Sequence, residues 1–303
     1  MPDFNRRAAL RLGAGVAVGA AGGYALDMLI QPRSSQAKSI PTAGTQVPLA
    51  PAPLTPAPPL GPAPSTEPAP TMTTGSFVSA ARGGISTNWA IARPPGQTRP
   101  LRPVIALHGK GSDAATVMAG GVEQGLAQAV NAGLPPFAVV AVDGGGGYWH
   151  KRASGEDAGA MVLDELIPML DKQNLDTSRV AFLGWSMGGY GALLLGGRLG
   201  PARTAAICAV SPALWLSSGA AAPGAFDGPD DFAADSVFGM PALASIPIRV
   251  DCGDSDPFYA GVQALAAALP AGSVVDLSKG CHVGSFFSSQ EPPSLQFLAR
   301  NLA

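Results

Sequence analysis

The sequence predicts a single α/β domain with a mostly parallel sheet that carries helices on both faces. Short, continuously apolar runs, typical of buried parallel strands, alternate with longer segments of helical apolar rhythm. The 303-residue chain is 47% hydrophobic, which is enough apolar material for one large core or two small ones. These two observations favour one domain of ordinary size, which we place at residues 75–303.

The first half of this domain begins with two strand-like segments, joined at Gly83-Gly84 by a sequence typical of a tight turn. Two strands and two helices should follow them. In chain order the elements are the strands GSFVSA (75–80), TNWAIAR (87–93) and PVIALHG (103–109), the helix 113–133, the strand FAVVAVDGG (137–145) and the amphipathic helix 159–173. The strands are mainly apolar, as expected when both faces of a sheet are covered.

The second half continues the alternation and then adds strands. Its elements are the strand RVAFLGW (179–185), the helix GGYGALLLGGRLG (188–200), and the strands TAAICAVSP (204–212), IPIRVDCG (246–253) and GSVVDLSKG (272–280). An insertion, residues 212–245, separates the first two of the last three strands. Segments at this place often form a lid or cap over a site, so we expect a cap here.

Charge and cysteine content exclude several classes of function. The net charge is −2 with 13% charged residues, so no basic surface for nucleic acid is expected. The three cysteines are too few for a disulfide scaffold, and none are spaced as in a zinc site. We therefore expect no zinc site.

The N-terminal segment, residues 1–37, resembles a twin-arginine export signal. Arg6 and Arg7 precede a weakly apolar run rich in Gly and Ala, which Asp27 interrupts. Cleavage after Ala37 would release the chain, and without cleavage the segment would be a membrane anchor. We expect an exported protein, located in the periplasm, in the cell envelope or outside the cell.

Residues 38–74 are rich in Pro and Ala and predict an extended linker. Such a sequence has too few large apolar residues to form a core. It would hold the domain away from a membrane or lead it through a cell wall, so association with the envelope would run through the N-terminus.

One five-residue motif carries the chemistry: Gly184-Trp185-Ser186-Met187-Gly188, which matches G-x-S-x-G between a predicted strand and a predicted helix. In this context the serine occupies a sharp turn that exposes its hydroxyl above the sheet. We interpret Ser186 as a nucleophile. The alternative is a packing turn lined by glycine.

A serine nucleophile needs a general base that is oriented by an acid, and this motif predicts the chain order Ser, Asp or Glu, His. His282 is the only histidine after Ser186, and it follows the last predicted strand. The acid should follow the preceding strand, where Asp256 is placed best and Asp254 is the alternative.

The oxyanion of an acyl-transfer intermediate needs two backbone N–H donors. The first is the amide of Met187, and the second should come from the loop LHGKGS (107–112), near Gly109 or Lys110. We expect His108 to orient this loop, although it could also lie near the substrate.

Together the segments GWSMGGYGALLL, LHGKGS, DCGDSDPFY and GCHVGSFF resemble the putative-esterase family of α/β-hydrolases. That family includes S-formylglutathione hydrolases, feruloyl esterases and mycobacterial mycolyltransferase antigens. The similarity covers about residues 100–300. It implies an α/β-hydrolase fold, with the cap before the strand that carries the acid, and cofactor-free acyl chemistry on serine.

Several residues are open to two interpretations. Tyr148, Trp149 and His150 either line a substrate pocket or pack their loop. Trp185 and Trp215 are further candidates for the pocket, and the aromatic residues of the cap cover a lipid chain or form a small core.

Cys252 and Cys281 flank the loops of the acid and the base on successive strands. An oxidising compartment would allow a disulfide between them, which would pin the two loops.

The sequence therefore predicts an exported serine esterase that acts on a small-molecule or lipid ester. One alternative is an acyltransferase with the same triad, which would move acyl groups to an envelope carbohydrate or lipid. The other is a non-catalytic binding protein on the same fold.

Overall fold

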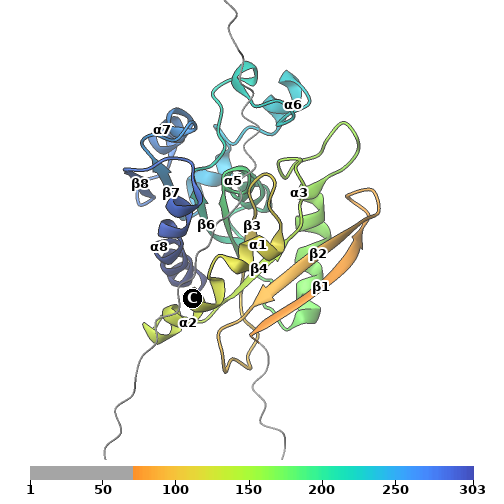
Figure 1. Ribbon diagram of the computed structural model, residues 1–303, viewed down its shortest axis with the longest axis vertical. Helices are drawn as coiled ribbons and strands as arrows, with labels where there is room; N and C mark the ends of the chain where they lie inside the picture. Colours follow the sequence, from red (N-terminus) through yellow and green to blue (C-terminus); the bar gives the residue numbers. More distant parts are fainter. Residues whose placement is uncertain (1–70) are drawn as a thin grey trace, which may run out of the picture. The chain divides into compact units, whose positions relative to one another are not determined.

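The computed structural model describes residues 71–303 (Figure 1). The predicted signal and nearly all of the predicted linker lie outside this range. The first strand begins at Met72, inside the segment expected to be linker, so the folded domain starts slightly earlier than predicted. No helix within residues 71–303 is long and apolar enough to cross a membrane.

The described residues form one eight-stranded sheet in the order β1-β2-β4-β3-β5-β6-β7-β8. The strands are β1 (Met72–Ser79), β2 (Ile85–Ala92), β3 (Pro103–Leu107), β4 (Ala138–Val142), β5 (Val180–Trp185), β6 (Thr204–Val210), β7 (Ile248–Gly253) and β8 (Val274–Ser278). β2 runs antiparallel to β1 and β4, and all other pairs are parallel. The predicted mostly parallel sheet is confirmed.

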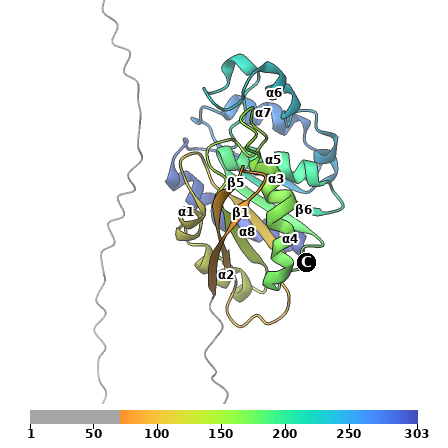
Figure 2. The same ribbon diagram turned by 90° about the vertical axis from the view of Figure 1, so that its right-hand side faces the viewer.

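Helices cover both faces of the sheet, as Figure 2 shows for α1 and α2 on one side and α3 and α4 on the other. The first face packs against α1 (Ala114–Ala119), α2 (Val122–Asn131) and α8 (Gly284–Leu302). The second packs against α3 (Ala158–Ala160), the π-helix η1 (Met161–Leu166), α4 (Ile167–Leu170), α5 (Met187–Leu199) and α7 (Tyr259–Ala268). A short 3-10 helix, η2 (Asp171–Gln173), ends the α4 segment.

The insertion between β6 and β7 contains short helices only: η3 (Ser218–Ala220), α6 (Pro229–Ala234) and η4 (Pro241–Ser245). Several of its side chains, including Phe226, Val237 and Leu243, pack onto the core of the second face. We refer to residues 212–245 as the cap.

Two predicted helices differ from the structure. The helix expected over 113–133 is divided, because Gly121 adopts a left-handed backbone (φ 108°) between α1 and α2. The helix expected over 159–173 passes through the π-helical turn η1 before Pro168. Proline lacks an amide hydrogen and its ring crowds the carbonyl four residues earlier, so a regular α-helix is not available there.

Candidate active site

Ser186 lies between β5 and α5 on a backbone that is unusual for an L-residue, with φ 56° and ψ −123°. Its amide donates to the carbonyl of Val210 at 3.0 Å, and its carbonyl accepts from Tyr190 at 3.1 Å and Ala213 at 3.0 Å. These bonds hold the turn from both sides. The side chain is half-buried, so its hydroxyl is fixed but accessible.

The glycines of the motif allow three backbone segments to meet at this turn. A Cβ on Gly188 would lie 1.9 Å from the carbonyl oxygen of Leu107, and one on Gly184 would lie 2.2 Å from that of Gly188. Neither clash is relieved by a rotamer change, because the opposing atoms are backbone. β3, β5 and α5 can therefore meet here only because both positions of the motif are glycine.

The structure brings Ser186, His282 and Asp256 into one hydrogen-bonded row. His282 Nε2 is 2.9 Å from Ser186 Oγ, and His282 Nδ1 is 2.8 Å from Asp256 Oδ2. An ionised carboxylate only accepts, so Nδ1 carries the hydrogen and Nε2 is free to accept the serine proton. This is the arrangement that a serine nucleophile needs.

The environment of Asp256 keeps this carboxylate ionised. Burial raises its pKa, but hydrogen bonds from His282 and from the amide of Phe258, together with the charge of His282, outweigh burial, so the pKa is below its ordinary value. Asp254, the alternative acid, instead pairs with Lys279 at 2.5 Å, which lowers its pKa. The residue that meets His282 is thus Asp256.

Aromatic rings hold the imidazole of His282 in place. Phe258 and Phe287 contact it edge-on, with ring centroids at 5.1 and 5.0 Å. These contacts restrict rotation of a side chain that is about a quarter exposed (24%).

The predicted oxyanion donors lie where β3 and α5 meet. Met187 is the first residue of α5, so its amide has no acceptor within the helix. Gly109 is buried against Trp185, because a Cβ there would lie 3.2 Å from the indole nitrogen, whereas Lys110 is exposed. The role of Met187, Gly109 and Lys110 in binding an oxyanion stays a prediction.

His108 orients two loops and is nearly inaccessible. Its Nε2 accepts from the amide of Gly144 at 2.9 Å, and its Nδ1 lies 2.8 Å from the carbonyl oxygen of Gly109. This pattern fixes a neutral ring with the hydrogen on Nδ1. Burial lowers its pKa, so the ring stays neutral over a wider pH range. His108 is a loop-orienting residue, not a pocket wall.

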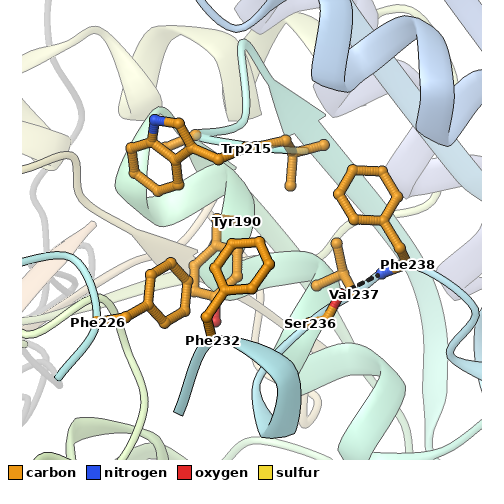
Figure 3. A pocket seen from close by; sticks show the side chains of 9 residues that line it. Tyr190, Trp215, Phe226, Phe232, Ser236, Val237 and Phe238 are labelled. Carbon is orange, nitrogen blue, oxygen red and sulfur yellow. Dashed lines mark hydrogen bonds between the residues drawn. The ribbon is translucent and has the colours of Figure 1, made fainter. Parts of the chain in front are cut away.

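A small apolar pocket, open to solvent, lies between α5 and the cap. Figure 3 shows its aromatic walls, which come from α5, from the start of the cap and from the region of α6. It is lined by Tyr190, Ala213, Leu214, Trp215, Phe226, Phe232, Ser236, Val237 and Phe238. We call it the aromatic pocket. Trp215 lines this pocket, and its role in binding a substrate stays a prediction.

The other predicted pocket residues do not line this pocket. Trp149 is fully buried against Gly144 and Gly191, where a Cβ would clash with its indole, so it belongs to the core. Tyr148 packs against Trp215 and lies under Lys110, whose Nζ is 5.5 Å from the ring. Trp185 packs against the first face of the sheet.

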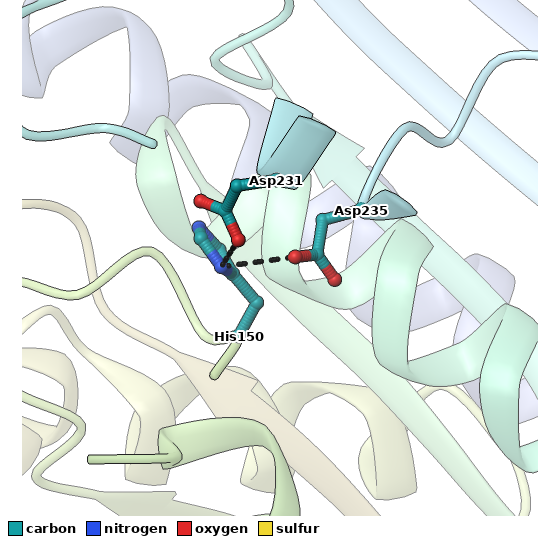
Figure 4. Close-up of side chains that lie close together, drawn as sticks. All are labelled: His150, Asp231 and Asp235. Carbon is teal, nitrogen blue, oxygen red and sulfur yellow. Dashed lines mark ion pairs between the residues drawn. The ribbon is translucent and has the colours of Figure 1, made fainter. Parts of the chain in front are cut away.

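The buried His150 belongs to a charged cluster with the buried Asp235 and the half-buried Asp231 of the α6 region (Figure 4). Its Nδ1 lies 3.1 Å from Asp235 and 3.8 Å from Asp231. One histidine and two carboxylates are a possible ligand set for a metal. However, Arg198 pairs with Asp235, and Arg152 approaches His150, so arginines already balance the acidic charge. We interpret the group as an ion-pair network.

Comparison with known families adds an independent observation. The model of the family described as "Putative esterase" matches residues 84–276, more than half of the chain. The chain belongs to this family. Its enzyme class is that of a serine carboxylic-ester hydrolase, in agreement with the prediction.

Solved structures support the fold of this esterase. A ferulic acid esterase is 21% identical with a TM-score of 0.62, covering 76% of this chain and 97% of that chain. FphF, a fluorophosphonate-binding serine hydrolase of Staphylococcus aureus, is 17% identical with a TM-score of 0.60, covering 77% and 98%. An S-formylglutathione hydrolase from Agrobacterium tumefaciens is 20% identical with a TM-score of 0.57, covering 77% and 95%. No curated protein matches the chain significantly.

The predicted disulfide of this esterase is wrong for the structure. Cys252 and Cys281 are both free thiols. Cys252 lies on β7 with its side chain in the core of the second face, and its Sγ is 3.6 Å from the carbonyl oxygen of Gly253. Cys281 lies in the exposed loop before His282. The side chains therefore occupy different environments.

Sequence reasoning missed the partners that organise the site of this esterase. Tyr190 lies one helical turn after Ser186, and that spacing could have placed it on the same face of α5. Asp231 and Asp235 are also one turn apart, so a helix in the cap would have brought both carboxylates to one face. Phe258 gave no signal, because its contact with His282 depends on tertiary packing.

Proposed function

We propose that this protein is an exported serine esterase that hydrolyses carboxylic esters through an acyl-enzyme on Ser186. The observation that carries the proposal is the row Ser186 Oγ–His282 Nε2–Asp256 Oδ2, with distances of 2.9 and 2.8 Å. Export rests on the twin-arginine resemblance of residues 1–37 alone.

The chemistry follows from the positions of these atoms. Ser186 Oγ attacks the ester carbonyl carbon while its proton moves to His282 Nε2. Asp256 stabilises the imidazolium that results, and the amides of Met187 and of the Gly109–Lys110 loop stabilise the oxyanion. The alcohol leaves with the proton from His282, and water then releases the acid by the same steps. An alcohol in place of water would make the same site an acyltransferase.

The test is hydrolysis of nitrophenyl acetate together with labelling by a fluorophosphonate. We expect the wild-type protein to do both, and Ser186→Ala to lose the label and about 10⁶-fold in turnover. His282→Ala should lose turnover to a similar extent. The matched control is Ser217→Ala, an exposed serine before η3, which should behave like the wild type.

Near wild-type turnover in a folded Ser186→Ala protein would contradict the mechanism. Absence of both turnover and label in the wild-type protein would favour a binding protein on this fold.

A further inference from the structure

The turn that follows β6 is bonded to the nucleophile and to the next strand. The carbonyl of Val210 accepts from the amide of Ser186, and the amide of Ala213 donates to the carbonyl of Ser186, each at 3.0 Å. Ser211 lies between these two residues, and its amide donates to the carbonyl of Asp251 on β7 at 2.7 Å. The position of Ser211 is therefore fixed relative to both Ser186 and the strand that leads to the acid.

The backbone of Ser211 is strained. Its φ of 44° lies in the left-handed region, which residues with a side chain seldom adopt. Pro212 follows, and a proline restricts the residue before it to extended conformations. Glycine would adopt this φ without a steric cost, yet the position carries a serine. Strained residues of this kind cluster at active sites, so the side chain of Ser211 is a candidate for a role in the reaction.

The hydroxyl of Ser211 is buried without a regular hydrogen bond. The residue is fully inaccessible, and its Oγ has no partner of normal hydrogen-bond geometry among the described residues. Nearly all buried polar groups are bonded, so an exception calls for a reason. The polar side chains next to this hydroxyl are the carboxylate of Asp256 and the thiol of Cys252.

The carboxylate of Asp256 can accept a further donor. Its Oδ2 accepts from His282 Nδ1 at 2.8 Å, and its Oδ1 accepts from the amide of Phe258 at 2.9 Å. The two oxygens of a carboxylate together accept about four hydrogen bonds. The side chain of Asp256 has no exposed surface, so bulk water does not supply the remaining ones. The hydroxyl of Ser211 is the neighbouring donor that does.

Cys252 competes weakly for the same hydroxyl. Burial, together with the charges of Asp256 and Asp251, raises the pKa of the Cys252 thiol to about 12, so the sulfur stays neutral. A hydrogen bond to an ionised acceptor is about twice as strong as one between neutral groups. The hydroxyl hydrogen of Ser211 can rotate, and it is therefore drawn to the carboxylate.

The charge state of Asp256 agrees with this direction. Burial raises the pKa of Asp256, but the hydrogen bonds from His282, from the amide of Phe258 and from the Ser211 hydroxyl, together with the charge of His282, bring it below its ordinary value. Ser211 thus helps to keep the acid ionised in a site that water does not reach.

We propose that Ser211 is a positioning residue for the catalytic acid: its hydroxyl donates to the carboxylate of Asp256 and fixes the orientation in which that carboxylate holds His282. The proposal rests on the proposed esterase function. Hydrogen bonds in active sites are often long or poorly aligned before substrate binds and tighten in the reacting complex, which accounts for the irregular bond in the free protein. The strained backbone is retained because it aims the hydroxyl at the acid.

The test removes the hydroxyl in two ways and follows kcat and KM for nitrophenyl acetate. Ser211→Ala keeps the strained backbone, whereas Ser211→Gly also relieves it. We expect both variants to lose about tenfold in kcat, because a hydrogen bond to a charged group contributes at least that factor. KM should not change, since Ser211 contacts no substrate atom.

The matched control is Ser294→Ala on α8. Ser294 is as buried as Ser211, and its Oγ likewise has no regular partner among the described residues. It lies beside Cys208 on the first face of the sheet and not at the triad. The same substitution there should leave kcat at the wild-type value.

A double-mutant cycle shows whether Ser211 acts through Asp256. In the Asp256→Ala background, Ser211→Ala should cause no further loss, because the carboxylate that it orients is absent. The rate of fluorophosphonate labelling at Ser186 follows these slow variants. A defect in the fold alone would instead add to the loss from Asp256→Ala.

The pH dependence of kcat/KM from pH 5 to 9 gives a readout of charge. Without the Ser211 donor, more of the carboxylate charge faces His282 and favours its protonated form. The midpoint of the acidic limb should therefore move to higher pH in Ser211→Ala. Several other ionisable groups lie around the acid and the base: Cys252, Asp251, Asp254 and Lys279.

These groups do not obscure the shift. Cys252 stays neutral over this range, and Asp254 and Lys279 stay charged because their pairing lowers the pKa of the first and raises that of the second. Burial raises the pKa of Asp251 to about 6, but its carboxylate pairs with Arg249, so it titrates alike in the wild type and in the variant.

Wild-type kcat in Ser211→Ala or in Ser211→Gly would overturn this inference and leave the esterase function standing. A further tenfold loss in the Asp256→Ala background, or an acidic limb that does not move, would do the same. If Ser211→Ala fails to fold, Ser211→Gly decides. If the wild-type protein turned over no nitrophenyl ester and took no fluorophosphonate label, both proposals would fall.

Discussion

At the scale of single residues, the site depends on which of two neighbouring carboxylates meets the imidazole. Asp256 accepts from His282, whereas Asp254 pairs with Lys279 on the exposed side of the same turn. Asp254 and Asp256 are only two positions apart in the sequence. Asp256 is nevertheless buried beside the base, whereas Asp254 forms an ion pair at the surface.

This difference predicts that the two Asp→Asn variants behave differently. Asp256→Asn should reduce kcat by about 10⁴, as loss of the orienting carboxylate does in serine proteases, because the amide favours the wrong imidazole tautomer. Asp254→Asn removes an ion pair with an exposed lysine and should leave kcat within a few-fold. Steady-state hydrolysis of nitrophenyl acetate at pH 8 measures both.

The two substitutions make the same chemical change in the same turn, so each variant is the control for the other. Equal losses in kcat would contradict the assignment of Asp256.

Residue-level prediction from the sequence was most definite where chain order limits the choice. With one histidine after Ser186, the base had a single candidate. It left Trp149 and His150 undecided between lining a pocket and packing their loop, because the pattern VVAVDGGGGYWH does not say which side chains turn inward. The left-handed backbone of Tyr148 and Trp149, with φ of 59° and 60°, decides that orientation and leaves no sequence signal.

At the scale of elements, Gly184 and Gly188 of the G-x-S-x-G turn are the positions where a larger side chain would disturb the fold most. Gly188 lets α5 begin directly against the end of β3, with no room for a methyl group beside the carbonyl of Leu107. The loop that carries the predicted oxyanion donors is built on that contact.

We therefore expect Gly188→Ala to lower both stability and kcat, because a backbone carbonyl cannot move aside and β3 and α5 must separate. Overpacking of this kind costs about 1–3 kcal/mol. Thermal unfolding and nitrophenyl acetate hydrolysis check the two effects. Gly219→Ala, in the exposed η3 with open space around its Cβ, is the matched substitution and should change neither.

A Gly188→Ala protein with wild-type melting temperature and kcat would show that the close approach of β3 and α5 is not required.

Strands and helices could be predicted from the sequence where the pattern of apolar residues points to one kind of element. Continuous apolar runs located the central strands β3, β4, β5 and β6, because strands buried on both faces tolerate few polar residues. The helices α7 and α8 were not predicted. α8 contains Pro292 and Pro293, which read as helix breakers, yet its buried residues Leu295, Leu298 and Leu302 pack on the first face and hold it there.

At the scale of the whole molecule, the antiparallel hairpin β1–β2 is bonded to the rest of the domain through its turn. Ser79 and the amide of Ala81 donate to Glu165 of η1. Arg82 is buried and bonds Glu156 and the carbonyl of Asp143, which follows β4. The hairpin thus joins the layer of α3 and η1 to the edge of the sheet.

The match to the family model begins at residue 84, after β1. The structure predicts that β1 is nevertheless required: a chain of residues 84–303 should unfold at a clearly lower temperature than one of residues 71–303. Removing Ser79 and Arg82 leaves the partly exposed carboxylates of Glu165 and Glu156 without these partners, and it also removes strand β1 from the sheet. Thermal unfolding followed by circular dichroism measures the difference.

The variant Arg82→Met in residues 71–303 separates the loss of this ion pair from the loss of the strand. Equal melting temperatures for the two truncated chains would contradict the role assigned to the hairpin.

The backbone of Ser186 has a consequence for how such a protein can change over evolution. A serine held at φ 56° carries a conformational cost of about 1–3 kcal/mol, which glycine at the same position would largely avoid. Mutations that relieve this strain would make a more durable protein that has lost its nucleophile. Selection for a more stable fold and selection for catalytic turnover therefore act in opposite directions at this one position. The serine is retained only while its chemistry is useful.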